Sequence, residues 1–200
     1  MIEIRAPAIV CASRPHGETA AIARVLTADH GLLAGYVAGG RGRQLRPVLI
    51  PGNEVAAQLT ARSASQLPFL KLELVTSRAQ WTSEPLPAAA IQWATTLAVT
   101  ALPEGNPYPA LYTALSALLD AVCHAPSARG WAVALLRFEA LVLRDLGYGE
   151  GAAAADDSWP AVLAALHASG ERIATRLLAD RRADVMAARR MLMERLNRIS

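Results

Sequence analysis

The first eighty residues alternate between apolar and polar positions over short stretches. Between residues 54 and 61, Val55, Ala57 and Leu59 would share one face of a strand. A period of two is typical of β-strands with one buried face. The predicted strands cover residues 8–13, 19–27, 32–38, 54–61 and 69–76. Five short strands at this spacing predict a small barrel, and the OB-fold is the common five-stranded case.

Turn residues separate these strands. Arg14-Pro15-His16-Gly17 predicts a turn directly after the first strand, and Asp29-His30-Gly31 predicts a hairpin turn with a positive φ at the glycine. We expect Phe69, which starts the last strand, to be a core residue. Alternation in that strand also predicts three leucines on the core face, Leu70, Leu72 and Leu74.

After residue 80 the apolar spacing becomes helical. Residues 82–87 are predicted to form a linker between a domain at 1–80 and a domain at 81–200. The predicted helices cover residues 88–102, 108–123, 128–146, 159–168 and 171–198. Ser169-Gly170 would separate the last two, and the last would break near Asp180. The predicted fold class is therefore α+β, an N-terminal five-stranded OB-fold barrel followed by an all-helical C-terminal domain.

The last predicted helix has one apolar face. That face carries Val185, Ala188, Leu192, Leu196 and Ile199. The arginines are expected to lie largely off this face, at Arg182, Arg189, Arg190 and Arg198.

Positive charge is concentrated in the first part of the chain. The net charge is +3. Residues 1–80 hold nine cations and five anions, whereas residues 81–200 hold eleven cations and twelve anions. Nearly all cations of the first part are arginines, whose planar guanidinium suits phosphate. This asymmetry indicates a polyanionic partner for the barrel.

Several function classes lack their sequence signals. No apolar run reaches the roughly 18 residues of a membrane span, and the opening residues do not resemble a signal peptide, so a cytoplasmic protein without membrane contact is expected. Cys11 and Cys123 stand alone, and both are expected to be buried. No GxSxG, HExxH, GxGxxG or P-loop motif occurs. We therefore expect no enzyme activity, no metal and no cofactor.

A glycine- and arginine-rich segment, residues 39–47, joins two predicted strands. Glycines let the backbone approach a phosphate, and Arg41, Arg43 and Arg46 can neutralise its charge. Arg14, in the predicted turn, and Arg24, in the second strand, would extend this basic face. A solvated basic loop without a partner is the alternative.

Aromatic residues are few in the predicted barrel. Tyr36 precedes the glycine- and arginine-rich segment and is either a core residue or a platform for stacking bases. Because such platforms are scarce, binding is expected to be mainly electrostatic, tolerant of sequence and weakened by salt.

Two arginines interrupt an apolar stretch of the helical half. Arg137, Leu141 and Arg144 would share one side of a helix. This arrangement indicates either surface salt bridges or a groove with a basic rim for an acidic peptide. Asp156-Asp157 is expected to lie in a loop that leads into a helix N-terminus.

The order of these motifs resembles the RecO family of recombination and repair mediators. The matching segments are Ala8-Ile9-Val10, Arg14-Pro15-His16-Gly17-Glu18-Thr19, Thr27-Ala28-Asp29-His30-Gly31, Gly39-Gly40-Arg41, Arg46-Pro47, Pro51-Gly52, Leu136-Arg137-Phe138-Glu139 and Leu146-Gly147-Tyr148-Gly149. Ala187-Ala188-Arg189-Arg190 to Arg195-Leu196 is similar to the family's closing helix.

The resemblance implies an OB-fold, a helical domain, binding to single- and double-stranded DNA, and annealing of complementary strands. It also implies action with RecR to load RecA onto DNA coated with single-stranded-DNA-binding protein, whose acidic C-terminal tail docks on the helical domain in some members. Carried over, Arg14, Arg41, Arg43 and Arg46 are DNA-contact candidates, and Arg137 is a candidate for the tail groove.

The chain departs from many relatives after Gly149. Relatives often carry a cysteine zinc motif there, whereas residues 150–158 are short and contain no cysteine. We therefore expect no zinc. Other hypotheses remain open: a protein–protein adaptor, an RNA-binding OB-fold protein, and a hydrolase with an unrecognised site.

Overall fold

The computed structural model describes residues 2–61, 63, 66–179 and 184–199. The chain divides into two compact units. The first contains residues 1–83 together with 102–112, and the second contains residues 84–101 and 113–200. Asp180 and Arg182 lie outside the described residues, so the expectations for them stay predictions.

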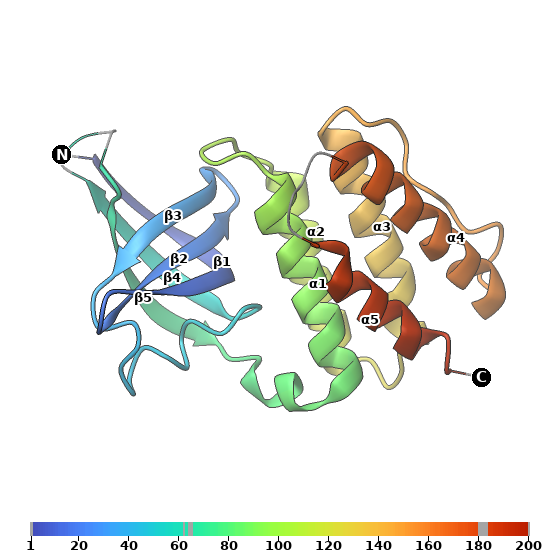
Figure 1. The fold of residues 1–200 in the computed structure, drawn as a ribbon, viewed down its shortest axis with the longest axis horizontal. Helices are drawn as coiled ribbons and strands as arrows, with labels where there is room; N and C mark the ends of the chain where they lie inside the picture. The colour runs from blue at the N-terminus through green and yellow to red at the C-terminus, as the bar shows by residue number, and fades with distance from the viewer. Residues whose placement is uncertain (1, 62, 64–65, 180–183, 200) are drawn as a thin grey trace. The chain divides into compact units, whose positions relative to one another are not determined.

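The first unit is a closed five-stranded barrel in the order β1-β2-β3-β5-β4, which confirms the predicted OB-type fold (Figure 1). The strands are β1 (Ile2–His16), β2 (Ala20–Thr27), β3 (Gly31–Val37), β4 (Glu54–Ala61) and β5 (Phe69–Thr76). All neighbours pair antiparallel except β3 and β5, which are parallel at Tyr36 and Phe69. The bounds of β4 and β5 agree with the predicted ones.

The first strand is longer than predicted. Its first half pairs with β4, from Ile2 to Ile9, and its second half pairs with β2, as far as His16. One strand thus serves two neighbours, with a register shift between Val10 and Ala12 where it passes from one to the other. The predicted turn at Arg14 is wrong, because Arg14 lies in the ladder opposite Ile22 and the turn begins at Gly17.

Small and branched side chains fill the barrel. Val55, Ala57 and Leu59 of β4 face the core, as their alternation predicted. The same alternation is wrong at the end of β5, where Leu74 is 42% exposed. The register between β4 and β5 shifts there, so that Val55 pairs with Leu74 and Val75 is left without a cross-strand partner. The bulge at Val75 ends the regular ladder, but Leu74 lies before it, opposite the buried Val55, so the bulge does not account for the exposure of Leu74.

The β2–β3 hairpin turns at Asp29-His30-Gly31, as predicted, and Gly31 has φ +68°. The hydroxyl of Thr27 accepts a hydrogen bond from the amide of His30. Glycine is also required for space, because a Cβ at Gly31 would lie 1.9 Å from the carbonyl oxygen of Asn106. Residues 102–112 of the same unit therefore pack directly on this hairpin.

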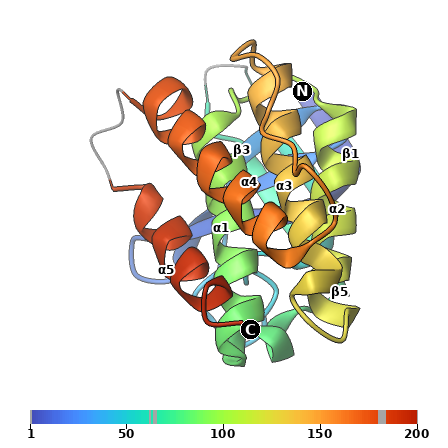
Figure 2. The ribbon, with the colours of Figure 1, turned by 90° about the vertical axis from the view of Figure 1, so that its right-hand side faces the viewer.

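The second unit is helical (Figure 2). Its elements are α1 (Pro85–Ala101), α2 (Pro109–His124), α3 (Arg129–Asp145), α4 (Trp159–Arg172), a π-helical turn (Ile173–Leu177) and α5 (Met186–Leu196). The first four residues of α2 belong to the barrel unit. Within the helical unit, α1 packs against α5 and α3 packs against α4.

Two predicted features of the helical part are wrong. The predicted linker at 82–87 is instead the end of a 3₁₀ turn, Ala79–Ser83, and the start of α1, where Pro85 suits the first helical turn. The predicted break at Ser169-Gly170 is absent, since α4 continues through both residues. Glycine serves packing there, because a Cβ at Gly170 would lie 2.0 Å from Nη1 of Arg189.

A buried ion pair lies at the centre of the helical unit. Glu139 accepts two hydrogen bonds of 2.9 Å from Arg189, one on each carboxylate oxygen. The indole of Trp93 donates a third, at 2.7 Å. Arg189 is 5% exposed, so its predicted place off the buried face of the last helix is wrong. Leu192 and Leu196 are buried on that face, as predicted.

Within the described part of the chain, no helix is both long and apolar enough to cross a membrane.

Candidate nucleic-acid interface

A pocket of about 370 Å³ opens at one end of the barrel. The end of β1, the start of β2 and the loop between β3 and β4 form its walls. We call this loop, residues 38–53, the β3–β4 loop. The pocket is lined by Ser13, Arg14, Pro15, Ala21, Gly40, Arg41, Arg46 and Leu49. Three of the six predicted DNA contacts, Arg14, Arg41 and Arg46, thus meet in one place.

The β3–β4 loop is held close to the barrel by its own sequence. The amide of Gly40 donates to the carbonyl of Val37, and a Cβ at Gly40 would lie 2.8 Å from the Cβ of Ala21. Val48 and Leu49 are buried in the barrel core. The glycine permits the close approach, and the apolar pair supplies the burial that returns the chain to the core.

Arg41 joins the loop to the turn between β1 and β2. Its Nη1 donates hydrogen bonds to the carbonyl oxygens of Gly17, at 3.0 Å, and Glu18, at 2.9 Å. Its backbone amide donates to the carbonyl of Thr19, at 3.0 Å. Arg41 therefore shapes the pocket as well as contributing charge to it.

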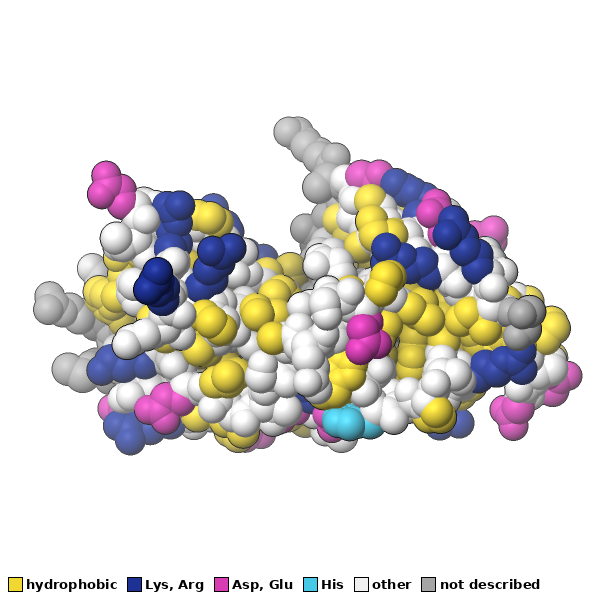
Figure 3. Space-filling view, turned by 90° about the horizontal axis from the view of Figure 1, so that it is seen from below, with side chains coloured by type: hydrophobic (Ala, Val, Ile, Leu, Met, Phe, Trp, Pro, Cys, Tyr) yellow, Lys and Arg dark blue, Asp and Glu magenta, His cyan; other side chains and the backbone are white. Residues whose placement is uncertain are grey.

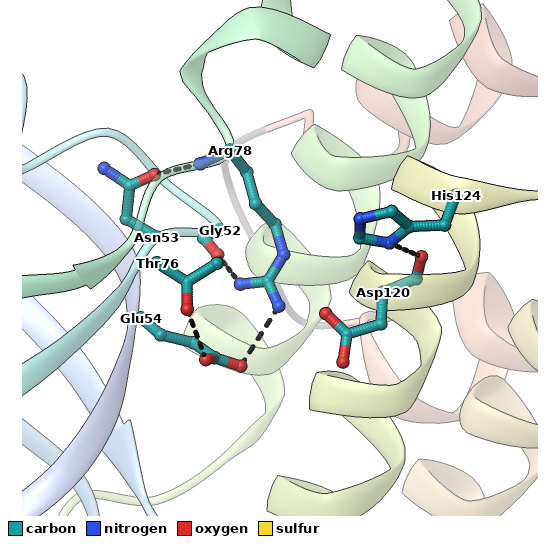
Figure 4. A network of polar contacts seen from close by, with 7 residues as sticks. All are labelled: Gly52, Asn53, Glu54, Thr76, Arg78, Asp120 and His124. Atoms are coloured by element: carbon teal, nitrogen blue, oxygen red, sulfur yellow. Dashed lines mark hydrogen bonds and ion pairs between the residues drawn. The ribbon is translucent and has the colours of Figure 1, made fainter.

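A polar network holds the far end of the same loop (Figure 4). Asn53 donates from Nδ2 to the carbonyl oxygens of Pro47, at 2.8 Å, and Val48, at 3.2 Å. Its Oδ1 accepts from the amide of Arg78, at 2.7 Å, and the guanidinium of Arg78 pairs with Glu54 at 3.0 Å. The exit of β5 and the entry of β4 therefore fix where the loop ends.

Most of the arginines in and beside the pocket are not paired with a carboxylate of the described chain. Arg14, Arg43 and Arg46 are exposed, and within the described chain none of them has a carboxylate at ion-pair distance. Arg43 lies on the same loop but is not among the lining residues. The space-filling view shows Lys and Arg side chains gathered on this side of the barrel (Figure 3).

Arg24 does not join this group. It lies in β2, as predicted, with its side chain on the outer side of the strand, but its Nη2 pairs with the carboxylate of Glu104 at 3.0 Å. Glu104 belongs to the segment at 102–112 that packs on the β2–β3 hairpin. The charge of Arg24 is therefore already compensated.

Aromatic residues gather beside the pocket. Tyr36 is partly exposed and contacts His16 at 5.8 Å and Phe69 at 5.5 Å between ring centroids, both edge to face. The expectation that Phe69 is a core residue is wrong, because it is 61% exposed. The sequence pattern did not predict that Phe69 and His16 meet Tyr36, because Phe69 stands at the start of a strand and Arg-Pro-His-Gly is typical of a turn.

The two predicted partner contacts lie on α3 of the helical unit. Arg137 and Arg144 are both exposed. Arg144 pairs with the adjacent Asp145, from Nη2 at 2.9 Å. Within the described residues, no ion pair is formed by Arg137.

The acidic pair at 156–157 lies in the loop that leads into α4, as predicted. Ser158 caps the helix by accepting a hydrogen bond from the amide of Ala161, and Asp156 accepts one from the amide of Ser158. Hydrogen bonds from Ser158 lower the pKa of Asp156. Among the residues that the structure describes, no group of three or more His, Cys, Asp or Glu side chains could hold a metal ion.

Together, these features define an α+β protein with a basic OB-fold barrel and a helical unit. Two family models match the sequence: Recombination protein O N terminal at residues 1–78 and Recombination protein O C terminal at residues 83–149. The chain belongs to the RecO family.

Relatives named DNA repair protein RecO support this assignment. The protein of Rhodospirillum centenum is 47% identical over 143 residues, which are 71% of this chain and 56% of that protein. The protein of Phenylobacterium zucineum is 41% identical over 149 residues, 74% of this chain and 60% of that protein. The match to Gluconacetobacter diazotrophicus is 40% identical over 151 residues, again 74% of this chain and 59% of the relative. The matches thus span less than two thirds of each relative.

Proposed function

We propose that this chain binds single- and double-stranded DNA through the basic pocket and anneals complementary strands, without catalysing a chemical reaction. One observation carries the proposal: Arg14, Arg41 and Arg46 converge on a single pocket. Arg14 and Arg46 have no carboxylate within ion-pair distance in the described chain, so their charge is available to phosphate.

The chemistry of the pocket favours binding without sequence readout. Each phosphate that an arginine neutralises releases condensed counterions, whichever base is attached. Neutralising the phosphates of two strands also reduces the repulsion between them. Complementary strands held by the same basic surface can then pair, which is the physical basis of annealing.

The proposal includes the family's wider role. Acting with RecR, the chain would load RecA onto DNA coated with single-stranded-DNA-binding protein. The acidic C-terminal tail of that protein would dock on α3, where Arg137 is exposed. We assign Arg144 the lesser part, because Asp145 already partly neutralises its charge.

The first test measures affinity for a mixed-sequence single strand against salt concentration. Arg14→Ala and Arg46→Ala should each weaken binding and lower the salt slope by about one. Arg5→Ala is the matched control, because Arg5 is an exposed β1 arginine that pairs with Glu3 at 2.7 Å. Unchanged affinity in the two pocket variants would remove the proposal's support. Equal or tighter binding to RNA of the same sequence would favour an RNA-binding protein instead.

The second test is an annealing assay on strands coated with single-stranded-DNA-binding protein, with and without its C-terminal tail. The wild-type chain should anneal coated strands faster when the tail is present. Arg137→Glu should lose this advantage and keep annealing of bare strands. No effect of tail deletion would contradict the docking on α3.

A further inference from the structure

One row of side chains crosses the outer side of the barrel and links the basic pocket to the aromatic residues. Arg14 of β1 lies opposite Ile22 of β2, Ile22 lies opposite Tyr36 of β3, and Tyr36 lies opposite Phe69 of β5. Residues directly opposite each other in neighbouring strands point to the same face of a sheet. The row therefore leads from a pocket-lining cation to an exposed aromatic ring.

The aromatic end of this row is fixed in place. The amide of Tyr36 donates to the carbonyl of Pro68, at 2.8 Å, which holds β3 beside the start of β5. His16 contacts Tyr36 from the other side, with ring planes at 89°. His16 follows Arg14 by two residues in β1, so both side chains lie on one face of that strand.

Resting on the proposed function, we infer that Phe69, Tyr36 and His16 form a stacking surface for the unpaired bases of single-stranded DNA. Phe69 offers its ring to solvent, at 61% exposure, and its contact with the partly exposed Tyr36 makes the two rings one exposed aromatic patch. The adjoining arginines would hold the phosphates of the strand whose bases stack on the rings. A flexible polyanion with aromatic bases matches both ends of the row.

This surface would distinguish single strands from duplex. Bases in a duplex are already stacked and paired, whereas unpaired bases have free faces. The basic pocket would bind both forms, since both carry phosphates. The aromatic row would add affinity for single strands only.

The experiment titrates the full chain with three ligands: an oligothymidylate, a strand of the same length built from abasic units, and a duplex. The wild type should bind the oligothymidylate about tenfold tighter than the abasic strand, as expected for base–aromatic stacking. Phe69→Ala should lose most of this preference and keep its affinity for the abasic strand and the duplex. Val75→Ala is the matched control, an exposed apolar residue of β5 outside the row.

Two conservative variants separate stacking from general apolar contact. Phe69→Trp should retain the preference for bases, and Phe69→Leu should lose it. A Phe69→Leu variant that behaves like the wild type would overturn the inference, as would a wild type that binds both strands equally. If the wild type binds both strands equally, the proposal of DNA binding is kept and only the proposal of a stacking surface is rejected. Absence of binding to all three ligands would overturn the proposed function itself.

Discussion

Arg41 links the β3–β4 loop to the turn between β1 and β2, because its Nη1 donates a hydrogen bond to the carbonyl oxygen of Gly17, at 3.0 Å. The two residues are separated by 24 positions in sequence. The contact joins two walls of the basic pocket, so the shape of the pocket depends on a residue that also supplies its charge.

Replacing Arg41 with lysine should therefore weaken DNA binding even though the charge is kept. Both hydrogen bonds come from Nη1, which lies one bond further from the backbone than the Nζ of a lysine, and an ammonium is more strongly hydrated than a guanidinium. We expect Arg41→Lys to lower affinity for single strands about fivefold, from the loss of two hydrogen bonds. Fluorescence anisotropy at fixed salt measures the affinity, and hydrogen exchange at the Arg41 amide reports the loop.

Arg43→Lys is the matched control, because Arg43 lies on the same loop, is exposed and forms no ion pair within the described chain. Its affinity should stay within about twofold of the wild type, since only charge is required there. An equal loss of affinity in both variants would show that the guanidinium group itself, and not the hydrogen bonds from Arg41 to the β1–β2 turn, sets the affinity.

Arg24 is expected to contribute little to DNA binding. Its guanidinium pairs with Glu104 at 3.0 Å, so removing it removes little available charge. We expect Arg24→Ala to weaken binding less than Arg46→Ala does, measured at the same salt concentration. Glu104→Gln should strengthen binding, because it leaves the Arg24 charge uncompensated.

Stability should hardly change in either variant, because exposed ion pairs contribute about 0–1 kcal/mol. A loss of affinity in Arg24→Ala as large as that in Arg46→Ala would place Arg24 in the interface and contradict its assignment to the contact with residues 102–112.

Local sequence pattern predicted the parts of the fold that depend on local contacts. The alternation in residues 54–61 and 69–76 gave the bounds of β4 and β5, because a barrel strand buries every second side chain. The glycines of residues 39–47 predict a loop, because glycine adopts backbone conformations that other residues avoid, and Gly39 does have φ +67°. The concentration of arginine in the first eighty residues indicates a basic surface, although not its geometry.

The features that pattern could not predict depend on contacts distant in sequence. Arg14 reaches the pocket because β1 continues to His16, a length set by pairing with two neighbours. The compensation of Arg24 depends on Glu104, eighty residues later. Arg189 has the residue type of a surface position, and only its partner on α3 explains its burial.

The buried pair of Glu139 and Arg189 yields a prediction about stability. Arg189→Met leaves the Glu139 carboxylate buried, with the indole of Trp93 still donating to it. Breaking one side of a buried pair typically destabilises by about 3–5 kcal/mol. We expect a loss of this size in the free energy of unfolding, measured by urea titration with tryptophan fluorescence.

Arg190→Met provides the control, since the neighbouring Arg190 is exposed and pairs with Asp184 at the surface. Its effect should be within about 1 kcal/mol. The double variant Glu139→Leu with Arg189→Met should recover much of the loss, because no unpaired charge then remains buried. A single Arg189→Met variant as stable as the wild type would contradict the structural role of the pair.

The last prediction concerns pH and the thiol of Cys11. Burial raises the pKa of Cys11 from 9.0 to about 12 in the folded chain. Between these values the unfolded chain releases a proton that the folded chain keeps, so rising pH favours unfolding, by up to about 1.4 kcal/mol per pH unit. The contribution of Cys11 is fully present below pH 9 and is lost as pH rises toward 12.

We expect Cys11→Ala to show a shallower fall of the free energy of unfolding above pH 9 than the wild type. Alkylation in a Cys123→Ala background gives an independent measurement, and rapid labelling of Cys11 in the folded chain at pH 9 would contradict the raised pKa.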